Sequence, residues 1–178
     1  LKKNEVVGIC DIDTRALTAV LRDNGSMNAA IVIGEKTAEE VAEILEELKT
    51  YRHSVALNTV TTRQSYKRSP EGEISYRLAL LDLGVREALL HCLTHYGCEV
   101  TVLPAGATAE EILATAPDGL VLSNGPFDRA AYEELTDTVR AVVKTGLPIL
   151  AVDSGHLLLA LAQGAETVAL PFGHHGTN

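Results

Sequence analysis

A strand, a tight turn and a helix follow one another in residues 147–158, and one side chain stands at the tip of the turn. The apolar residues 147–152 run directly into Asp153-Ser154-Gly155, and a helical pattern begins at once. This layout is typical of a nucleophile elbow, which holds one side chain out at the top of a sheet. An acyl-transfer site needs Cys or Ser at the tip, and here the residue is Asp153. The sequence therefore predicts the frame of an acyl-transfer site without its nucleophile.

The tip residue decides what chemistry this frame can perform. Amide hydrolysis through a thioester needs a thiolate, a neighbouring base and an oxyanion hole, and a carboxylate is a poor substitute. Loss of a nucleophile costs on the order of 10⁶ in kcat in a comparable enzyme series, so we expect amide hydrolysis near background. Asp153 could instead form an ester itself, but no second base is identifiable. Ser154 stands one residue past the tip, where a structural or helix-capping role is the stronger interpretation.

Alternating strands and helices must position this turn. Apolar strands are expected at 77–83, 99–103, 119–123, 148–152 and 167–170, and helices at 85–96, 108–116, 130–144 and 156–162. Repeated strand–helix units with apolar strands predict an α/β fold with a parallel sheet covered by helices on both faces. Ligands of such sheets bind beyond the carboxyl ends of the strands. Three turns, at 82–84, 123–126 and 153–155, are expected to meet there.

The first part of the chain predicts a smaller α/β domain. Strands are expected at 6–10 and 29–33, with a helix at 14–23 capped by Asp13 and a second helix at 37–49 that opens with a capping box. Residues 54–74 lose this periodicity and contain the basic residues Arg63, Lys67 and Arg68 and the turn-forming pairs Ser69-Pro70 and Glu71-Gly72, which is typical of an exposed linker. We place the first domain at 1–58, the linker at 59–74 and the second domain at 75–178.

Composition excludes several classes of function. The chain has 178 residues and a net charge of −9, so clustered phosphate contacts, and hence nucleic-acid binding, are not expected. No apolar run approaches the length of a membrane span. Three cysteines without a CxxC pair favour a reducing, cytoplasmic setting, and we interpret all three as small core residues. His174-His175 lacks partners at ligand spacing, so we expect no metal and no cofactor. The unusual first and last residues suggest a fragment of a longer protein.

Four motifs in one order carry a resemblance to a known family. They are Asp11-Ile-Asp-Thr-Arg15, Leu122-Ser-Asn-Gly-Pro126, Ala151-Val-Asp-Ser-Gly-His156 and Phe172-Gly-His-His-Gly176. Together they resemble the small subunit of carbamoyl-phosphate synthetase, a class I glutamine amidotransferase joined to an N-terminal domain. The resemblance implies a flavodoxin-like amidotransferase core, preceded here by part of the small N-terminal α/β domain. It also implies that glutamine is hydrolysed to ammonia for a large ATP-using subunit, in pyrimidine and arginine biosynthesis.

The departures from the family fall on its glutamine site. The family elbow is Gly-Ile-Cys-Leu-Gly-His-Gln, so Asp153 takes the place of the nucleophile Cys. Three further pocket positions are substituted: Phe127 stands where the family has a Gly that meets substrate, Ser154 replaces Leu, and Leu157 replaces Gln. Gly125 is retained, where a tight turn and a close approach to ligand are equally good explanations. The family's catalytic His and Glu would lie beyond the last residue.

The resemblance therefore implies a carbamoyl-phosphate synthetase small-subunit homologue with a degenerate glutaminase site. Family members without the Cys work with free ammonia, so a structural or regulatory role beside the large subunit is expected, with glutamine binding in doubt. One alternative is an active glutaminase subunit. Another is a repurposed module that binds a metabolite or a protein. An open pocket beside Gly125 and Asp153 would favour the module, and a pocket filled by Phe127 and Leu157 would favour the structural role.

Overall fold

The chain divides into two compact units. The computed structural model describes residues 1–25, 27–49, 53–127, 129–168 and 170. The larger unit spans Arg52–Thr167, and the smaller contains Leu1–Tyr51. Within the described ranges, no helix combines the length and the apolar character needed to cross a bilayer.

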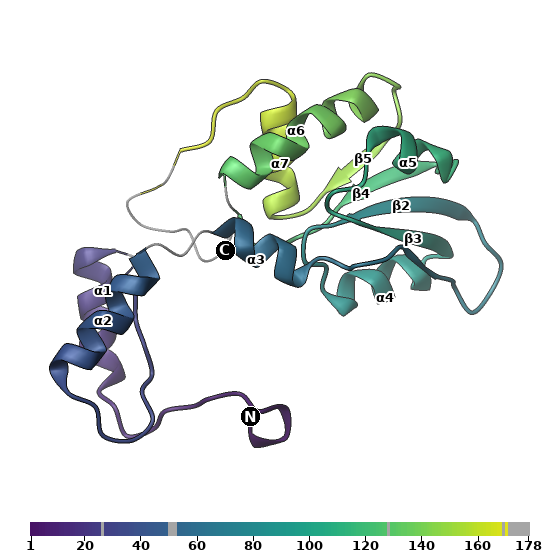
Figure 1. Cartoon of the computed structure of the whole chain (residues 1–178). Helices are drawn as coiled ribbons and strands as arrows, with labels where there is room; N and C mark the ends of the chain where they lie inside the picture. Colours follow the sequence, from purple (N-terminus) through teal and green to yellow (C-terminus); the bar gives the residue numbers. More distant parts are fainter. Residues whose placement is uncertain (26, 50–52, 128, 169, 171–178) are drawn as a thin grey trace. The chain divides into compact units, whose positions relative to one another are not determined.

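The described residues of the larger unit form a five-stranded sheet in the order β1-β3-β2-β4-β5 (Figure 1). The strands are β1 (Tyr66–Arg68), β2 (Tyr76–Asp82), β3 (Cys98–Pro104), β4 (Gly119–Leu122) and β5 (Ile149–Ala151). β2 pairs in parallel with β3 and β4, β5 pairs in parallel with β4, and β1 is an antiparallel edge strand beside β3. The parallel strands follow the flavodoxin-like order, which confirms the predicted fold class.

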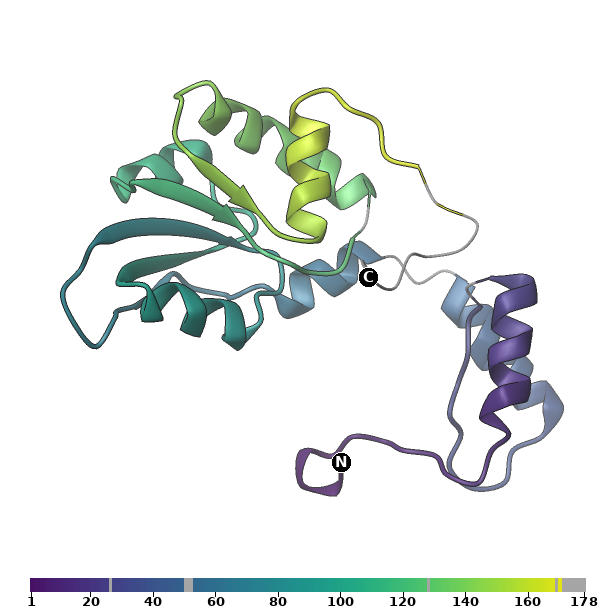
Figure 2. The same ribbon diagram turned by 180° about the vertical axis from the view of Figure 1, so that it is seen from behind.

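Helices cover both faces of this sheet (Figures 1 and 2). They are α3 (His53–Val60), α4 (Glu87–His95), α5 (Ala109–Ala114), α6 (Arg129–Val143) and α7 (Ser154–Ala162). On one face, Leu90 of α4 packs with Leu80 of β2. On the other, Leu158 of α7 packs with Leu81 of β2 and Leu122 of β4. Neighbouring side chains of β2 are thus buried on opposite faces, which is why the strand is a continuous apolar run.

Local capping signals are realised as predicted. In α5, the Glu111 backbone N–H donates to Thr108 Oγ1 at 3.2 Å, and the Thr108 N–H donates to Glu111 Oε2 at 2.8 Å. These reciprocal bonds satisfy two of the donors that a helix start leaves without partners. The capping box therefore fixes where α5 begins.

The predicted linker is partly regular structure. Residues 54–74 contain most of α3, whose Leu57 is buried in the core, and all of β1. The prediction of an irregular stretch is wrong there because β1 is held by pairing with β3, more than 30 residues later in the chain, as in the pair Tyr66–Val102. The predicted last strand is also wrong, since 167, 168 and 170 are not in a strand, and Ala169 lies outside the described residues. The domain boundaries remain a prediction.

The smaller unit has two amphipathic helices, α1 (Thr14–Asn24) and α2 (Ala38–Lys49), after a short 3₁₀ turn at Lys2–Asn4. The predicted cap of α1 is confirmed, because Asp13 Oδ1 accepts from the Ala16 N–H at 2.9 Å. The predicted strands at 6–10 and 29–33 are wrong: both segments are irregular and pair with no described strand. Most of their apolar side chains are exposed, to 80% at Ile33, and Val32 is half-buried. An apolar run becomes a strand only where a neighbour supplies hydrogen bonds.

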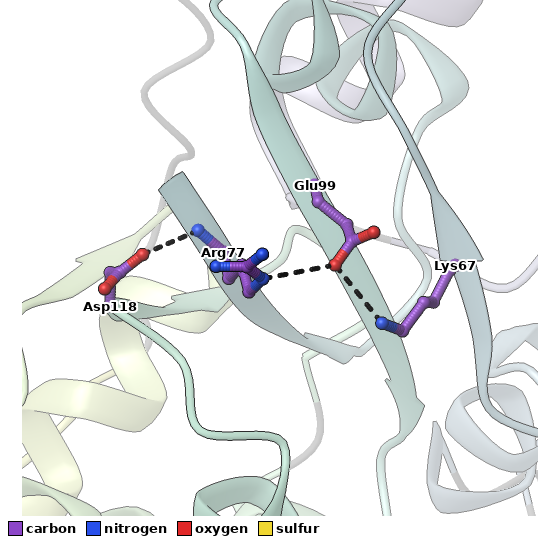
Figure 3. A network of polar contacts seen from close by, with 4 residues as sticks. All are labelled: Lys67, Arg77, Glu99 and Asp118. Atoms are coloured by element: carbon purple, nitrogen blue, oxygen red, sulfur yellow. Dashed lines mark hydrogen bonds and ion pairs between the residues drawn. The ribbon is translucent and has the colours of Figure 1, made fainter. Parts of the chain in front are cut away.

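Charged side chains tie the strands together at the amino edge of the sheet (Figure 3). Glu99 Oε1 of β3 lies 3.2 Å from Lys67 Nζ of β1 and 3.7 Å from Arg77 Nε of β2. Asp118, just before β4, accepts from the Arg77 backbone N–H at 2.7 Å. The Asp118 N–H in turn donates to the Arg77 carbonyl at 2.7 Å. We name these four residues the amino-edge network.

Candidate functional site

The turn after β5 has the sharp geometry predicted for a nucleophile elbow. Asp153 has φ 54° and ψ −117°, a left-handed conformation that L residues seldom adopt. The turn is closed by hydrogen bonds from the Gly155 N–H to the Val152 carbonyl and from the His156 N–H to the Asp153 carbonyl, both 2.9 Å. Such strain costs about 1–3 kcal/mol and persists where the surroundings enforce it. The Asp153 side chain is exposed and does not cap α7.

Close packing against β4 enforces the elbow. A Cβ on Gly155 would lie 2.5 Å from the Leu122 carbonyl oxygen and 2.7 Å from that of Ser123. Both distances are shorter than real Cβ contacts, so only Gly lets the start of α7 approach the end of β4 this closely. The Val152 N–H also donates to the Leu122 carbonyl at 3.0 Å. The elbow is thus fixed directly to the place where the next loop begins.

A buried carboxylate organises the neighbouring turn after β2. Asp82 is 4% exposed. Its Oδ1 accepts from the N–H groups of Gly84 at 2.9 Å and Val85 at 2.8 Å, and its Oδ2 accepts from the Thr62 N–H at 2.7 Å. Three backbone donors satisfy this carboxylate inside the protein. Asp82 therefore links the turn after β2 to the segment between α3 and β1.

The turns after β2 and β4 are bonded to each other. Buried Ser123 accepts from the Leu83 N–H at 2.9 Å, and the Asn124 amide donates to the Gly84 carbonyl at 3.0 Å. A Cβ on Gly125 would lie 1.7 Å from the Leu83 carbonyl oxygen. The close approach that requires Gly125 is thus made to the backbone of this chain, which explains the glycine as a turn residue. A role in ligand binding stays a prediction.

Aromatic packing holds the other end of the loop after β4. The half-buried Phe127 ring meets the Tyr132 ring edge to face, with centroids 5.0 Å apart and planes at 88°. Tyr132 lies on α6 and is fully buried. Burial raises the pKa of its phenol; the Ser154 hydroxyl lowers that pKa in part, and the Asp153 carboxylate raises it further. Phe127, Tyr132 and the elbow therefore lie together.

Two hydroxyls beneath the elbow lack partners. Tyr132 Oη and Ser154 Oγ are both buried. The two hydroxyls lie near each other, but neither meets a well-aligned hydrogen-bond partner among the described residues. Native proteins bury few such groups, and those that occur need a particular explanation. The Ser154 hydroxyl is buried inside the protein, whereas the Asp153 side chain at the tip is exposed. Ser154 also holds the position whose backbone N–H commonly contributes to an oxyanion hole.

The predicted site residues gather at the carboxyl edge of the sheet. Asp153 and Ser154 form the elbow, Gly125 and Phe127 lie in the loop beside it, and Leu157 is half-buried on the first turn of α7. Sequence reasoning placed the turns that contain Asp82 and Ser123 at this edge but missed the buried hydrogen bonds by which they organise it, and it missed Tyr132. Tyr132 offered a weak signal, as an aromatic residue on the apolar side of a predicted helix. The catalytic and binding roles of the predicted residues remain predictions.

Two of the three cysteines do not lie in the core, where they were expected. Cys98 is buried, and burial raises its pKa, whereas Cys10 and Cys92 are exposed, contrary to the core positions predicted. Cys10 lies in the segment that does not form a strand, and Cys92 lies on the outer side of α4. Within the described ranges, no three His, Cys, Asp or Glu side chains converge as a metal site would require. His174-His175 and the rest of their motif lie outside the described residues.

Comparison with known families agrees with this geometry. Residues 79–178 match the family described as glutamine amidotransferase class-I, and residues 1–31 match the CPSase domain of the carbamoyl-phosphate synthase small chain. The carbamoyl phosphate synthase small chain of Photorhabdus laumondii is 38% identical, and the match covers 100% of this chain and 50% of the relative. Those of Pseudomonas syringae pv. tomato and Vibrio vulnificus are 39% and 37% identical, each with all of this chain and 51% of the relative covered.

The chain spans about half the length of these curated relatives. Its sheet order, its elbow after β5 and the residues matched by the family are mutually consistent. The chain belongs to the class-I glutamine amidotransferase family and is similar to carbamoyl phosphate synthase small chains.

Proposed function

We propose that this chain is part of a carbamoyl-phosphate synthetase small subunit whose glutaminase site has lost its chemistry, and which serves the enzyme as a structural or regulatory subunit. The observation that carries the proposal is the elbow itself. Its strained backbone and its contact with β4 match what a nucleophile needs, yet the side chain at the tip is Asp153.

The chemistry of a carboxylate supports loss of activity. Thioester formation needs a thiolate, and a carboxylate does not attack an unactivated amide at a useful rate. Asp153 also places negative charge beside the point where an oxyanion would form, which opposes the electrostatic stabilisation on which acyl transfer depends. A neutral or cationic residue at position 153 would not repel the oxyanion in this way.

The loop after β4 supports a structural role over a binding role. Phe127 packs against the apolar core and against Tyr132. A loop whose side chain packs on the protein's own core is the arrangement expected of a structural subunit. A repurposed module would need open space there for a metabolite. An active glutaminase is disfavoured because Phe127, Asp153 and Leu157 depart from the family together.

The proposed partner subunit and cellular location are taken from the family resemblance. We propose a large synthetase subunit as the partner, which would take ammonium from solution to make carbamoyl phosphate for pyrimidine and arginine biosynthesis. The cytoplasm is the proposed location. No cofactor or metal is proposed for this chain.

The test uses the full-length parent protein with its large subunit. Carbamoyl phosphate formation is measured with ammonium and, separately, with glutamine, in the presence and absence of the small subunit. The proposal predicts a stable complex and synthesis from ammonium, with glutamine-dependent synthesis at background. Glutamine-dependent synthesis at a rate similar to that with ammonium contradicts it. Absence of any complex would favour the repurposed module.

A further inference from the structure

The loop after β4 is fixed to the sheet where it begins. Ser123 Oγ donates to the Asn124 carbonyl at 2.9 Å and accepts from Leu83, and the Asn124 amide bonds to Gly84. Gly125 lies so close to Leu83 that the two backbones are in contact. This end of the loop therefore cannot move toward β2, and it cannot move away without breaking several hydrogen bonds.

The loop is fixed again at Phe127. Its ring is half-buried against the apolar core and edge-on to Tyr132, which is itself fully buried. Aromatic pairs of this kind add favourable geometry to the large apolar area that each ring buries. Phe127 thus acts as an anchor, and the residues between it and Asn124 are held at both ends.

The anchor lies beside the elbow. Gly155 of the elbow approaches the Ser123 carbonyl, where this loop begins. Phe127 also contacts the ring of Tyr132, which shares its apolar core with Leu158 of α7. The Tyr132 and Ser154 hydroxyls are buried without well-aligned hydrogen-bond partners among the described residues. The apolar contact of the Phe127 ring is therefore the best-formed interaction of this corner.

We propose that Phe127 acts as a plug: its ring occupies the space beside the elbow, which we call the cradle, and so excludes an amino-acid amide the size of glutamine. This exclusion does not depend on which residue stands at position 153. This inference rests on the proposed function, because it takes the elbow and its loop to be the former glutamine site. It adds a second, independent block to the missing nucleophile. Restoring the thiol alone should therefore not restore access for substrate.

The experiment measures access to a thiol placed at the tip. Asp153→Cys is made in the whole chain together with Cys10→Ser and Cys92→Ser, which remove the exposed thiols, while Cys98 is buried. Alkylation rates are measured with iodoacetamide, which is small, and with a chloroketone that carries the α-amino and α-carboxyl groups of glutamine. Phe127 is then changed to Leu, Ala and Gly in this background. Leu147→Ala, a half-buried contact of the same core, is the matched control.

If Phe127 is a plug, shrinking residue 127 should change the alkylation rate of the chloroketone only. Iodoacetamide should react at similar rates throughout, whereas the ratio of chloroketone to iodoacetamide rates should rise as residue 127 shrinks. We expect at least about a tenfold rise for Ala or Gly, equivalent to about 1.4 kcal/mol. Leu147→Ala should leave the ratio unchanged. The graded series, with folding followed by circular dichroism, keeps the test valid even where Phe127→Gly fails to fold.

Two results would overturn the plug. One is a high chloroketone preference with Phe127 in place, because the cradle would then already be open. The other is no preference in any folded variant, because no cradle for a glutamine-like ligand would then exist behind the ring. Both concern access alone. The nitrogen-source assay on the full-length enzyme reports on the proposed function separately, so the two ideas fail by different measurements.

Discussion

The two edges of the sheet in the larger unit differ in how completely their polar groups are paired. At the amino edge, Glu99, Arg77 and Asp118 are paired with one another or with backbone groups (Figure 3). At the carboxyl edge, Asp153 is held in a strained backbone conformation, and Tyr132 and Ser154 bury hydroxyls without partners. Strain alone does not separate the two edges, because Ala116, two residues before Asp118, also has a positive φ of 48°. The buried hydroxyls without partners are what distinguish the carboxyl edge, and native proteins bury few such groups. The difference lies on the edge where we propose the former glutamine site.

Substitution of Gly125 is expected to disrupt the carboxyl edge more than any other change considered. Gly125→Ala forces a Cβ to within 1.7 Å of the Leu83 carbonyl oxygen, so we expect a loss of at least about 3 kcal/mol in the free energy of unfolding. Urea denaturation measures it. Gly106→Ala is the control, because a Cβ there meets nothing within 4 Å. A loss below about 1 kcal/mol at Gly125 would show that the two turns separate readily.

Two buried serines of the carboxyl edge should respond in opposite ways. Ser123→Ala leaves the buried Leu83 N–H without its acceptor and should cost about 1–3 kcal/mol. Ser154→Ala removes a hydroxyl that has no partner among the described residues and should be neutral or slightly stabilising. Thermal unfolding of the two variants side by side tests this. Equal losses would indicate that Ser154 is satisfied, for example by buried water.

Relief of the strain at the elbow should stabilise the chain. Gly adopts positive φ without the Cβ penalty, so Asp153→Gly should raise the free energy of unfolding by about 1–2 kcal/mol. Asp153→Ala keeps the penalty and should change stability little. The difference between the two variants isolates the backbone contribution from loss of the carboxylate. If both behave alike, the turn is not strained by its side chain.

The amino-edge network should give the smallest effect. Glu99 is well covered, but Lys67 and Arg77 are both more than 60% exposed, so Glu99→Gln should cost about 0.5–1 kcal/mol at low salt. The difference from the unchanged chain should shrink as salt rises, because exposed charges are screened. Unfolding midpoints at two salt concentrations measure it. A salt-independent loss above about 2 kcal/mol would mean that the network acts as a buried cluster.

The features that sequence predicted well are local. The Asp13 cap and the capping box at Thr108 depend on residues within one helical turn, and the elbow depends on a strand, a turn and a helix in immediate succession. The family motifs added the order in which these elements meet. Such signals lie within a few residues of each other, so the chain itself displays them.

The features that sequence missed depend on distant partners. Ser123 bonds Leu83 across 40 residues, and Asp82 bonds Thr62 across 20. β1 exists only because β3 accepts it as a neighbour, whereas the apolar runs at 6–10 and 29–33 find no such neighbour among the described residues. Periodicity cannot reveal which segments come together.

Glutamate release from glutamine by the full-length protein tests the central claim, that the elbow keeps the frame of an amidotransferase site without its chemistry. The unchanged protein, Asp153→Ala, and Asp153→Cys combined with Phe127→Gly are compared with the large subunit bound. We predict background release for the first two and measurable release for the third alone. Release by the unchanged protein that Asp153→Ala abolishes would contradict the claim, because Asp153 would then be a working nucleophile.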